Sequence, residues 1–412
     1  MADQLGSYSQ FRLNLEQQRK RAKELLKAAR AGVPAARVRF KSLPQLAEAQ
    51  HLIAQELRFS NWTALKQHIA AMSSERDSMS TLDGDSRTLH IRCGSDLAEP
   101  LRQAGFSGDF YEHNYPYLIG PVREGPGCLE QRARFIVDAY SDSPRRIEAE
   151  LLGLQRAEQL LHDSAGYDRV VIWSELDCYD QLVLVRLLGH YATQPRPAQL
   201  ELINVGDFPG AARFIGLGQL PPEALRLLWA TRRAATPAIL KVGLETWRAL
   251  VNPDPRALAA IMRSGTPALP LLANALHRHL RELPSTVNGL SLTEEMSLQL
   301  LLAAGEMPLM QLIGRQVDEL DPLPGQGDSN VRYRLLSMEG ASARVFERHP
   351  GIGLDVQTPW TDRLSITDLG RAVLAGEVDF RSLQPPNRWV GGVEIGRGQP
   401  DWRWNERARE LS

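Results

Sequence analysis

The residues best suited to chemistry form one short acidic stretch near the middle of the chain. It contains Glu175, Asp177 and Asp180, followed by Gln181. The β-branched and aromatic residues at 170–173 precede it and predict a buried strand over 169–173. Ligands of open α/β sheets bind outside the carboxyl ends of the strands. We therefore expect the acidic stretch to lie where a ligand would bind.

Carboxylates in this pattern suit several roles. Glu175, Asp177 and Asp180 could hold a divalent cation such as Mg²⁺ through oxygen ligands, as magnesium sites in phosphoryl chemistry do. They could instead bind ribose hydroxyls, or one of them could accept a proton as a general base. In the structural alternative, Asp177 caps the following helix and Asp180 favours the positive N-terminal end of that helix. The sequence leaves all of these roles open.

A second candidate loop follows the first predicted strand, at 88–93. Gly94, Ser95 and Asp96 connect this strand to a helix predicted over 97–104. Glycine permits close backbone approach, and free amides at a helix start bind anions. Because sequential elements of a parallel sheet usually neighbour one another, we expect this loop near the acidic stretch. Phosphate with magnesium, or a nucleotide-like small molecule with its ribose on a carboxylate, would suit both loops.

The order of the predicted elements indicates the fold class. Strands predicted at 88–93, 109–112, 169–174 and 199–205 alternate with helices, of which the longest region is 128–164. Such alternation is typical of an α/β protein with a mainly parallel, Rossmann-like sheet covered on both faces. We place this α/β sheet domain at residues 88–220.

Helical segments are expected on both sides of the sheet domain. Residues 1–75 form a predicted helical module, with helices at 15–31, 43–59 and 60–71, and the polar residues 76–87 form a predicted linker. A helical segment is expected at 221–290, where proline opens each of four helices.

The C-terminal part, 291–405, predicts a helical, winged-helix-like module. Ser291 and Glu294 form a candidate capping box at its start. Helices are expected near 293–304, 307–320, 328–340 and 367–375, with an extended stretch around 352–366. Use of the module for packing or dimerisation and use for DNA binding both stay open. The helix at 328–340 offers only Arg332 and Arg334 as basic residues for DNA recognition.

Composition narrows the class of protein. The 412 residues are 43% hydrophobic and 24% charged, with a net charge of −1, which gives no global bias towards nucleic acid or membrane. No apolar run reaches the ~18 residues that a membrane span needs, and the N-terminus lacks a signal-peptide core. Cys93, Cys128 and Cys178 are predicted to be free thiols. These features together predict a cytoplasmic protein.

Several scattered motifs resemble one family. They are His90-Ile91 with Gly94-Ser95-Asp96, Gly120-Pro121-Val122, Trp173 with Glu175 and Asp177, Tyr179-Asp180-Gln181, Gly216-Leu217-Gly218-Gln219-Leu220, Asn288-Gly289-Leu290-Ser291 and Arg388-Trp389-Val390-Gly391-Gly392. Over residues 88–405 the chain resembles the bacterial domain of unknown function 1835 family, which has no established activity. The resemblance implies architecture more than function. The chain departs from the family pattern at Leu176, where members usually carry histidine, and at Ser95-Asp96, where they carry Asp-Ser.

Two classes of function remain after these observations. In the first, a nucleotide-like small molecule or a divalent metal binds between the loop at 94–96 and the acidic stretch, with or without catalysis. In the second, the chain is a non-catalytic regulatory or scaffold protein that uses the winged-helix-like module for protein or nucleic-acid contacts. Residues 1–80 carry 13 Lys and Arg against 7 Asp and Glu, a net charge of +6 that suits a solvated face or an acidic partner. No catalytic residue can be named, and the absence of Gly-Lys-Ser/Thr excludes a Walker-type phosphate loop.

Overall fold

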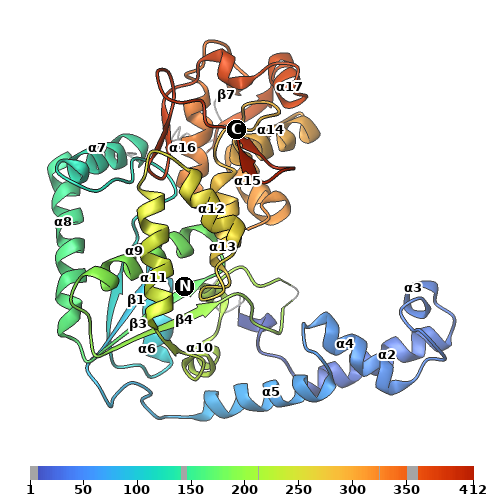
Figure 1. Ribbon diagram of the computed structural model, residues 1–412. Coiled ribbons are helices and arrows are strands. Elements are labelled where there is room, and N and C mark those ends of the chain that lie inside the picture. Colours follow the sequence, from blue (N-terminus) through green and yellow to red (C-terminus); the bar gives the residue numbers. More distant parts are fainter. Residues whose placement is uncertain (1–7, 141–145, 212, 324, 350–360) are drawn as a thin grey trace. The chain divides into compact units, whose positions relative to one another are not determined.

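A computed structural model describes the chain except for residues 1–7, 141–145, 212, 324 and 350–360 (Figure 1). The chain divides into two compact units, which we describe one at a time. The first comprises Met1–Glu112, Tyr167–Glu175 and Pro197–Ala234, and the second His113–Gly166, Leu176–Arg196 and Ala235–Ser412. Among the described residues, none of the helices combines the length and the apolar character needed to cross a membrane.

The first unit contains a five-stranded sheet with strand order β2-β1-β3-β4-β5. Its strands are β1 (Thr88–Arg92), β2 (Asp109–Glu112), β3 (Arg169–Glu175), β4 (Gln199–Val205) and β5 (Arg233–Ala234). Strands β1, β3 and β4 are labelled in Figure 1. The first four pair in parallel and β5 pairs antiparallel with β4, which confirms the mainly parallel sheet. Every residue of β1 and β3 is buried, as expected for strands covered on both faces.

Asp83, within the predicted linker at 76–87, contacts the first unit's sheet at His90. Its carboxylate is fully buried, accepts hydrogen bonds from the backbone amides of Ser107 and Gly108, and lies 2.9 Å from His90 Nε2. Burial opposes its ionisation, but the hydrogen bonds from His90, Ser107 and Gly108 outweigh burial and hold the pKa of Asp83 below its usual range. The second half of the expected linker is therefore anchored to the sheet.

Helices precede the sheet, as predicted for the N-terminal module. They are α2 (Leu15–Arg30), α3 (Pro34–Arg37), α4 (Leu46–Glu56) and α5 (Trp62–Asp77). The side chains of Asn14 and Asn61 cap α2 and α5 by accepting from backbone amides. Helix α5 continues six residues beyond the predicted end at residue 71. It packs against α10 (Pro222–Trp229), where the buried Glu223 pairs with Arg76.

The second unit contains the helices α7 (Cys128–Tyr140), α8 (Ile147–Asp163), α9 (Cys178–Thr193), α11 (Pro237–Leu250), α12 (Arg256–Ser264) and α13 (Leu272–Leu280). The predicted helical region at 128–164 is thus two helices, with residues 141–145 outside the described part. Helices α9 and α11 pack closely because glycines lie at their contact. A Cβ atom added to Gly243 would lie 2.3 Å from Leu188 Cβ, so this contact excludes any side chain.

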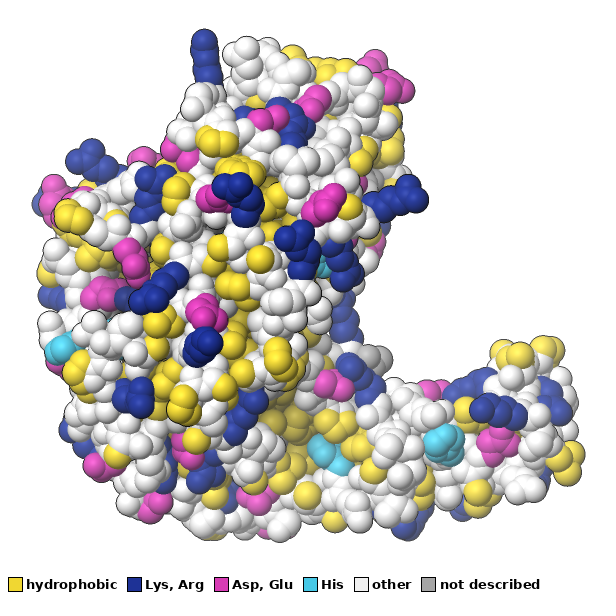
Figure 2. Space-filling view, in the orientation of Figure 1, with side chains coloured by type: hydrophobic (Ala, Val, Ile, Leu, Met, Phe, Trp, Pro, Cys, Tyr) yellow, Lys and Arg dark blue, Asp and Glu magenta, His cyan; other side chains and the backbone are white. Residues whose placement is uncertain are grey.

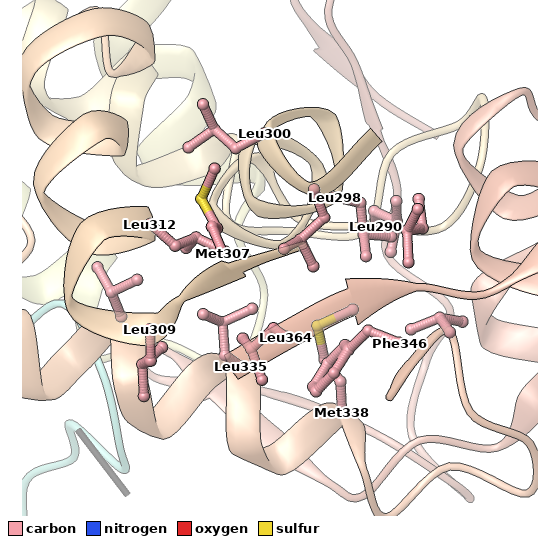
Figure 3. Packing of buried hydrophobic residues seen from close by; sticks show 14 of the residues in the cluster. Leu290, Leu298, Leu300, Met307, Leu309, Leu312, Leu335, Met338, Phe346 and Leu364 are labelled. Atoms are coloured by element: carbon pink, nitrogen blue, oxygen red, sulfur yellow. The ribbon is translucent and has the colours of Figure 1, made fainter. Parts of the chain in front are cut away.

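The C-terminal part of the second unit surrounds one apolar core, part of which Figure 3 shows. Its elements are α14 (Leu292–Ala304), β6 (Glu306–Pro308), α15 (Leu309–Arg315), α16 (Asp328–Met338), β7 (Phe346–His349), β8 (Arg363–Ile366) and α17 (Asp368–Leu374). The strands form an antiparallel sheet of order β6-β8-β7. Short antiparallel pairs, β9 (Arg388–Val390) with β10 (Val393–Ile395) and β11 (Trp404–Asn405) with β12 (Glu410–Leu411), complete the chain.

One expectation for this part needs correction. The continuous helix predicted at 307–320 begins instead with β6 and ends in a five-residue π-helical turn at Gln316–Leu320. Of the extended stretch expected at 352–366, residues 352–360 lie outside the described residues, and the strand β8 agrees with the expectation over 363–366.

The three cysteines are free thiols. Lys, Arg, Asp and Glu side chains are interspersed on the face drawn in Figure 2.

The helix contact at Gly243 generates a stability prediction. Gly243→Ala should destabilise the protein by about 1–3 kcal/mol because the added methyl group overpacks against Leu188. Gly314→Ala is the matched control, since Gly314 also lies in a helix and an added Cβ meets nothing within 4 Å. The control should be stabilised by up to about 1 kcal/mol through helix propensity. Urea unfolding followed by circular dichroism measures both, and equal effects of the two substitutions would contradict the packing argument.

Candidate functional site

The loop after β1 begins with Gly94 and enters a short helical segment. A 3₁₀ turn, η2 (Ser95–Leu97), leads into the six-residue helix α6 (Ala98–Gln103). The predicted helix over 97–104 is therefore shorter, and its first turn is 3₁₀. Gly94 has φ −145°, an extended conformation that any residue adopts, so the backbone itself does not require glycine there. A helix this short offers little support for an anion site at its start.

Arg92 joins this loop to the end of β3. Its side chain is 4% exposed, and its Nε and Nη2 atoms lie 3.2 Å from the two carboxylate oxygens of Asp96. Its Nη2 also lies 3.1 Å from Glu175 Oε1. A buried guanidinium needs such counter-charges because leaving it unpaired costs several kcal/mol. The structure therefore brings Asp96 and Glu175 together, as the sequence predicted, through an arginine that the prediction did not include.

A third loop, at residues 215–219, closes over the same carboxylates. The Leu217 amide donates to Glu175 Oε2, and Gln219 Oε1 accepts from the amides of Ile215 and Gly216. A Cβ atom on Gly216 would lie 2.6 Å from Glu175 Oε1, and one on Gly218 would lie 2.8 Å from Asp96 Oδ2. The loop backbone thus approaches both carboxylates closely, and a side chain at either position would displace a carboxylate oxygen. The sequence analysis did not place this loop at the site, and the spacing of Gly216 and Gly218 is the signal that could have indicated it.

The acidic stretch itself connects β3 to α9. Asp177 is the N-cap residue of α9, with φ −74° and ψ 167°, and its Oδ1 accepts from the Asp180 amide at 2.9 Å. The Gln181 amide donates to the Asp177 carbonyl at 3.1 Å, which begins the helix. Asp180 lies in the first turn, where the helix dipole favours a negative charge. The hydrogen bond proposed in the capping alternative is thus present, and Asp177, Asp180 and Gln181 are all buried.

Capping alone does not account for the arrangement of all three carboxylates. Glu175, Asp177 and Asp180 are buried, and each places one oxygen within 4.8 Å of the oxygens offered by the other two. Two ligand oxygens on one ion are separated by at most twice the metal–oxygen distance, about 4.2 Å for Mg²⁺ and about 4.8 Å for Ca²⁺. The spacing therefore suits a hard divalent cation, directly for Ca²⁺ and with a small contraction for Mg²⁺.

Comparison with known proteins adds no further assignment. No family model matches the chain, and none of the curated proteins is significantly similar to it. The resemblance to the domain of unknown function 1835 family stays a prediction from the motifs.

The contacts of Arg92 predict an asymmetry between its two partners. Glu175→Gln should destabilise the protein by about 3–5 kcal/mol because it removes a buried counter-charge from a buried guanidinium. Asp96→Asn should cost about 1 kcal/mol or less because the Asp96 side chain is 36% exposed and solvent screens its charge. Chemical denaturation of both variants measures the difference. A larger loss from Asp96→Asn would contradict the assignment of Glu175 as the main partner.

Proposed function

We propose that the protein binds a divalent cation through Glu175, Asp177 and Asp180, and that the cation carries a phosphate-bearing, nucleotide-like small molecule. The observation that supports this most directly is the convergence of three buried carboxylates within 4.8 Å of one another. Oxygen ligands of this kind are those that Mg²⁺ and Ca²⁺ prefer. The proposal concerns binding, and it assigns no residue a catalytic role.

The negative charges of the acidic residues favour binding of a cation over binding of an anion alone. Three carboxylates in six residues repel one another, and the repulsion is strongest when water is excluded. Arg92 offsets part of the charge of Glu175, but the same guanidinium also serves Asp96. A phosphate would therefore enter more readily together with a cation than alone. In this proposal, the nucleotide-like small molecule predicted from the sequence binds to the metal ion.

The alternative function, contact with a protein or nucleic acid, depends on the C-terminal module. We propose that residues 291–405 include a winged-helix-like module whose third helix, α16, packs inside the protein. The helix and strand order α14-β6-α15-α16-β7-β8 and the sheet order β6-β8-β7 support the likeness. The exposures of Arg332 and Arg334 are 7% and 2%, so neither side chain is available to a DNA groove. These exposures favour packing over nucleic-acid recognition.

Hydrogen exchange tests the packing role of α16. Addition of duplex DNA to the full chain should leave the exchange rates of amides in residues 328–338 unchanged, because the basic residues of this helix are buried. Protection of these amides by DNA would contradict the packing role and support the regulatory alternative.

The cation proposal predicts a loss of metal affinity in two variants. Asp177→Asn and Asp180→Asn should each weaken binding of Mg²⁺ or Ca²⁺ by at least about tenfold, since each removes a charged oxygen ligand. Folding should change little in Asp177→Asn, because asparagine caps a helix about as well as aspartate. Isothermal titration calorimetry with the metal alone, then with ATP added to the metal-loaded protein, measures both steps.

Asp207→Asn is the matched control for this titration. Asp207 also follows a parallel strand, β4, but it is exposed and pairs with Arg58. The control should bind metal as the wild type does. If the wild type binds neither cation, or if all three variants behave alike, the capping role of Asp177 is sufficient and the cation proposal is wrong.

A further inference from the structure

A cavity in the second unit has no role in the cation proposal. It encloses about 300 Å³ and is bordered by the segment at 115–125 and by α7, α8, α9 and α11. This volume is at the lower end of the range for small-molecule sites, roughly 300–1,000 Å³. Its lining includes apolar and aromatic side chains, among them Leu154, Tyr117 and Trp247. It also includes charged side chains, two of which contact Trp247: Glu124 accepts from its Nε1 and Arg186 lies over its ring.

Arg132 is the main charged group in the lining. The side chain is buried, and its Nη atoms donate to the backbone carbonyls of Pro116, Ile119 and Pro121. Among the described residues, no carboxylate lies within ion-pairing distance of this guanidinium. Carbonyl dipoles satisfy its hydrogen bonds without neutralising its charge, and burial accordingly lowers the pKa of Arg132. A buried, uncompensated positive charge at a cavity wall would attract an anion.

The other charged residues of the lining do not cancel the positive charge of Arg132. Arg186 pairs with Glu158 at 2.5 Å, so these two side chains compensate each other. The carboxylate of Glu124 accepts from Trp247 Nε1 at 2.5 Å, and the guanidinium of Arg123 lies over the Trp389 ring. The lining thus contains three arginines and two glutamates, a net charge of +1.

Contacts with neighbouring side chains hold the aromatic rings of the lining. The Trp247 and Tyr117 rings form a T-shaped pair with centroids 5.3 Å apart, and the Arg186 guanidinium lies 5.2 Å from the Trp247 ring centroid. Rings fixed by such contacts favour a flat, apolar guest, because stacking adds to the free energy of burial.

From these observations we propose that the cavity binds a small aromatic carboxylate, with its ring against Trp247 and Tyr117 and its charge towards Arg132 and Arg123. The aromatic wall selects a planar ring, and the single excess positive charge selects a monoanion over a neutral or dianionic analogue. This site lies within the second unit and uses none of the residues 175–180. It therefore goes beyond the cation proposal, and either one can fail while the other holds.

A pair of probes tests the proposal without any substitution. Indole-3-carboxylate and indole-3-carboxamide have nearly the same shape but differ in charge. Titration of the full chain by calorimetry should give saturable binding of the carboxylate, at least tenfold tighter than that of the amide. Equal affinities, or no binding of either probe at millimolar concentration, would overturn the proposal.

Cys128 reports whether a bound probe occupies this cavity. It lines the cavity, is partly exposed and donates to the Gly125 carbonyl, whereas Cys93 belongs to the first unit. Burial raises the pKa of the Cys128 thiol, so alkylation by iodoacetamide is best followed at alkaline pH by peptide mass spectrometry. The carboxylate probe should slow alkylation of Cys128 and leave that of Cys93 unchanged. Binding that does not protect Cys128 would place the probe elsewhere and contradict the proposal.

Variants of exposed arginines test the contribution of charge. Arg132→Gln removes a residue that holds three carbonyls and can unfold the segment, so Arg123→Gln is the informative change. Arg123 is exposed at the cavity, while Arg134 is exposed on α7 and does not line it. Arg123→Gln should weaken carboxylate binding several-fold and leave amide binding unchanged, and Arg134→Gln should alter neither. The same loss in both variants would mean that only the net charge of the protein matters, which would overturn the proposed site.

Discussion

The buried guanidinium of Arg92 is the interaction on which the arrangement of the first unit's sheet edge depends. A charge at 4% exposure cannot be left without partners, so the loop after β1 and the end of β3 must each supply a carboxylate. The loop at 215–219 then closes on the same carboxylates through the Leu217 amide, with its backbone close to them at Gly216 and Gly218. Three segments far apart in the sequence are thereby fixed at one edge of the sheet.

Much of this sheet followed from patterns in the sequence. The apolar runs at 88–93 and 169–174 predict strands buried on both faces, and the helices between them imply parallel pairing. Both expectations are confirmed, with β1 directly beside β3. Local signals also located helix starts well, because Asn61 and Asp177 are residues whose side chains cap helices. Periodicity could not locate helix ends as precisely, and α5 continues six residues past its expected end.

Other features could not be predicted because they depend on pairings between distant residues. Nothing in the residues around Asp83 indicates that its carboxylate is buried against Ser107 and His90. Arg92 was a charged residue within a predicted strand, and only the fold places Glu175 beside it. The convergence of Glu175, Asp177 and Asp180 was predictable because they lie on one strand-to-helix turn. The cavity at Arg132 was not, because its wall comes from five separate segments.

The capping role of the acidic turn and the metal-binding role that we propose for it do not exclude each other. Asp177 begins α9 through its hydrogen bond to the Asp180 amide, and the same turn brings three carboxylate oxygens to the spacing of a metal site. A helix cap holds its carboxylate in a fixed place before any ion arrives, which lowers the ordering cost of binding. In the proposed function, a structural element common to many proteins therefore also positions metal ligands.

The most direct test is anomalous diffraction from a crystal of the full chain soaked in Mn²⁺, which replaces Mg²⁺ at oxygen sites and scatters anomalously. Our account predicts an anomalous peak within bonding distance of carboxylate oxygens from Glu175, Asp177 and Asp180. The absence of a peak at these residues, at a Mn²⁺ concentration that occupies other sites in the same crystal, would contradict it.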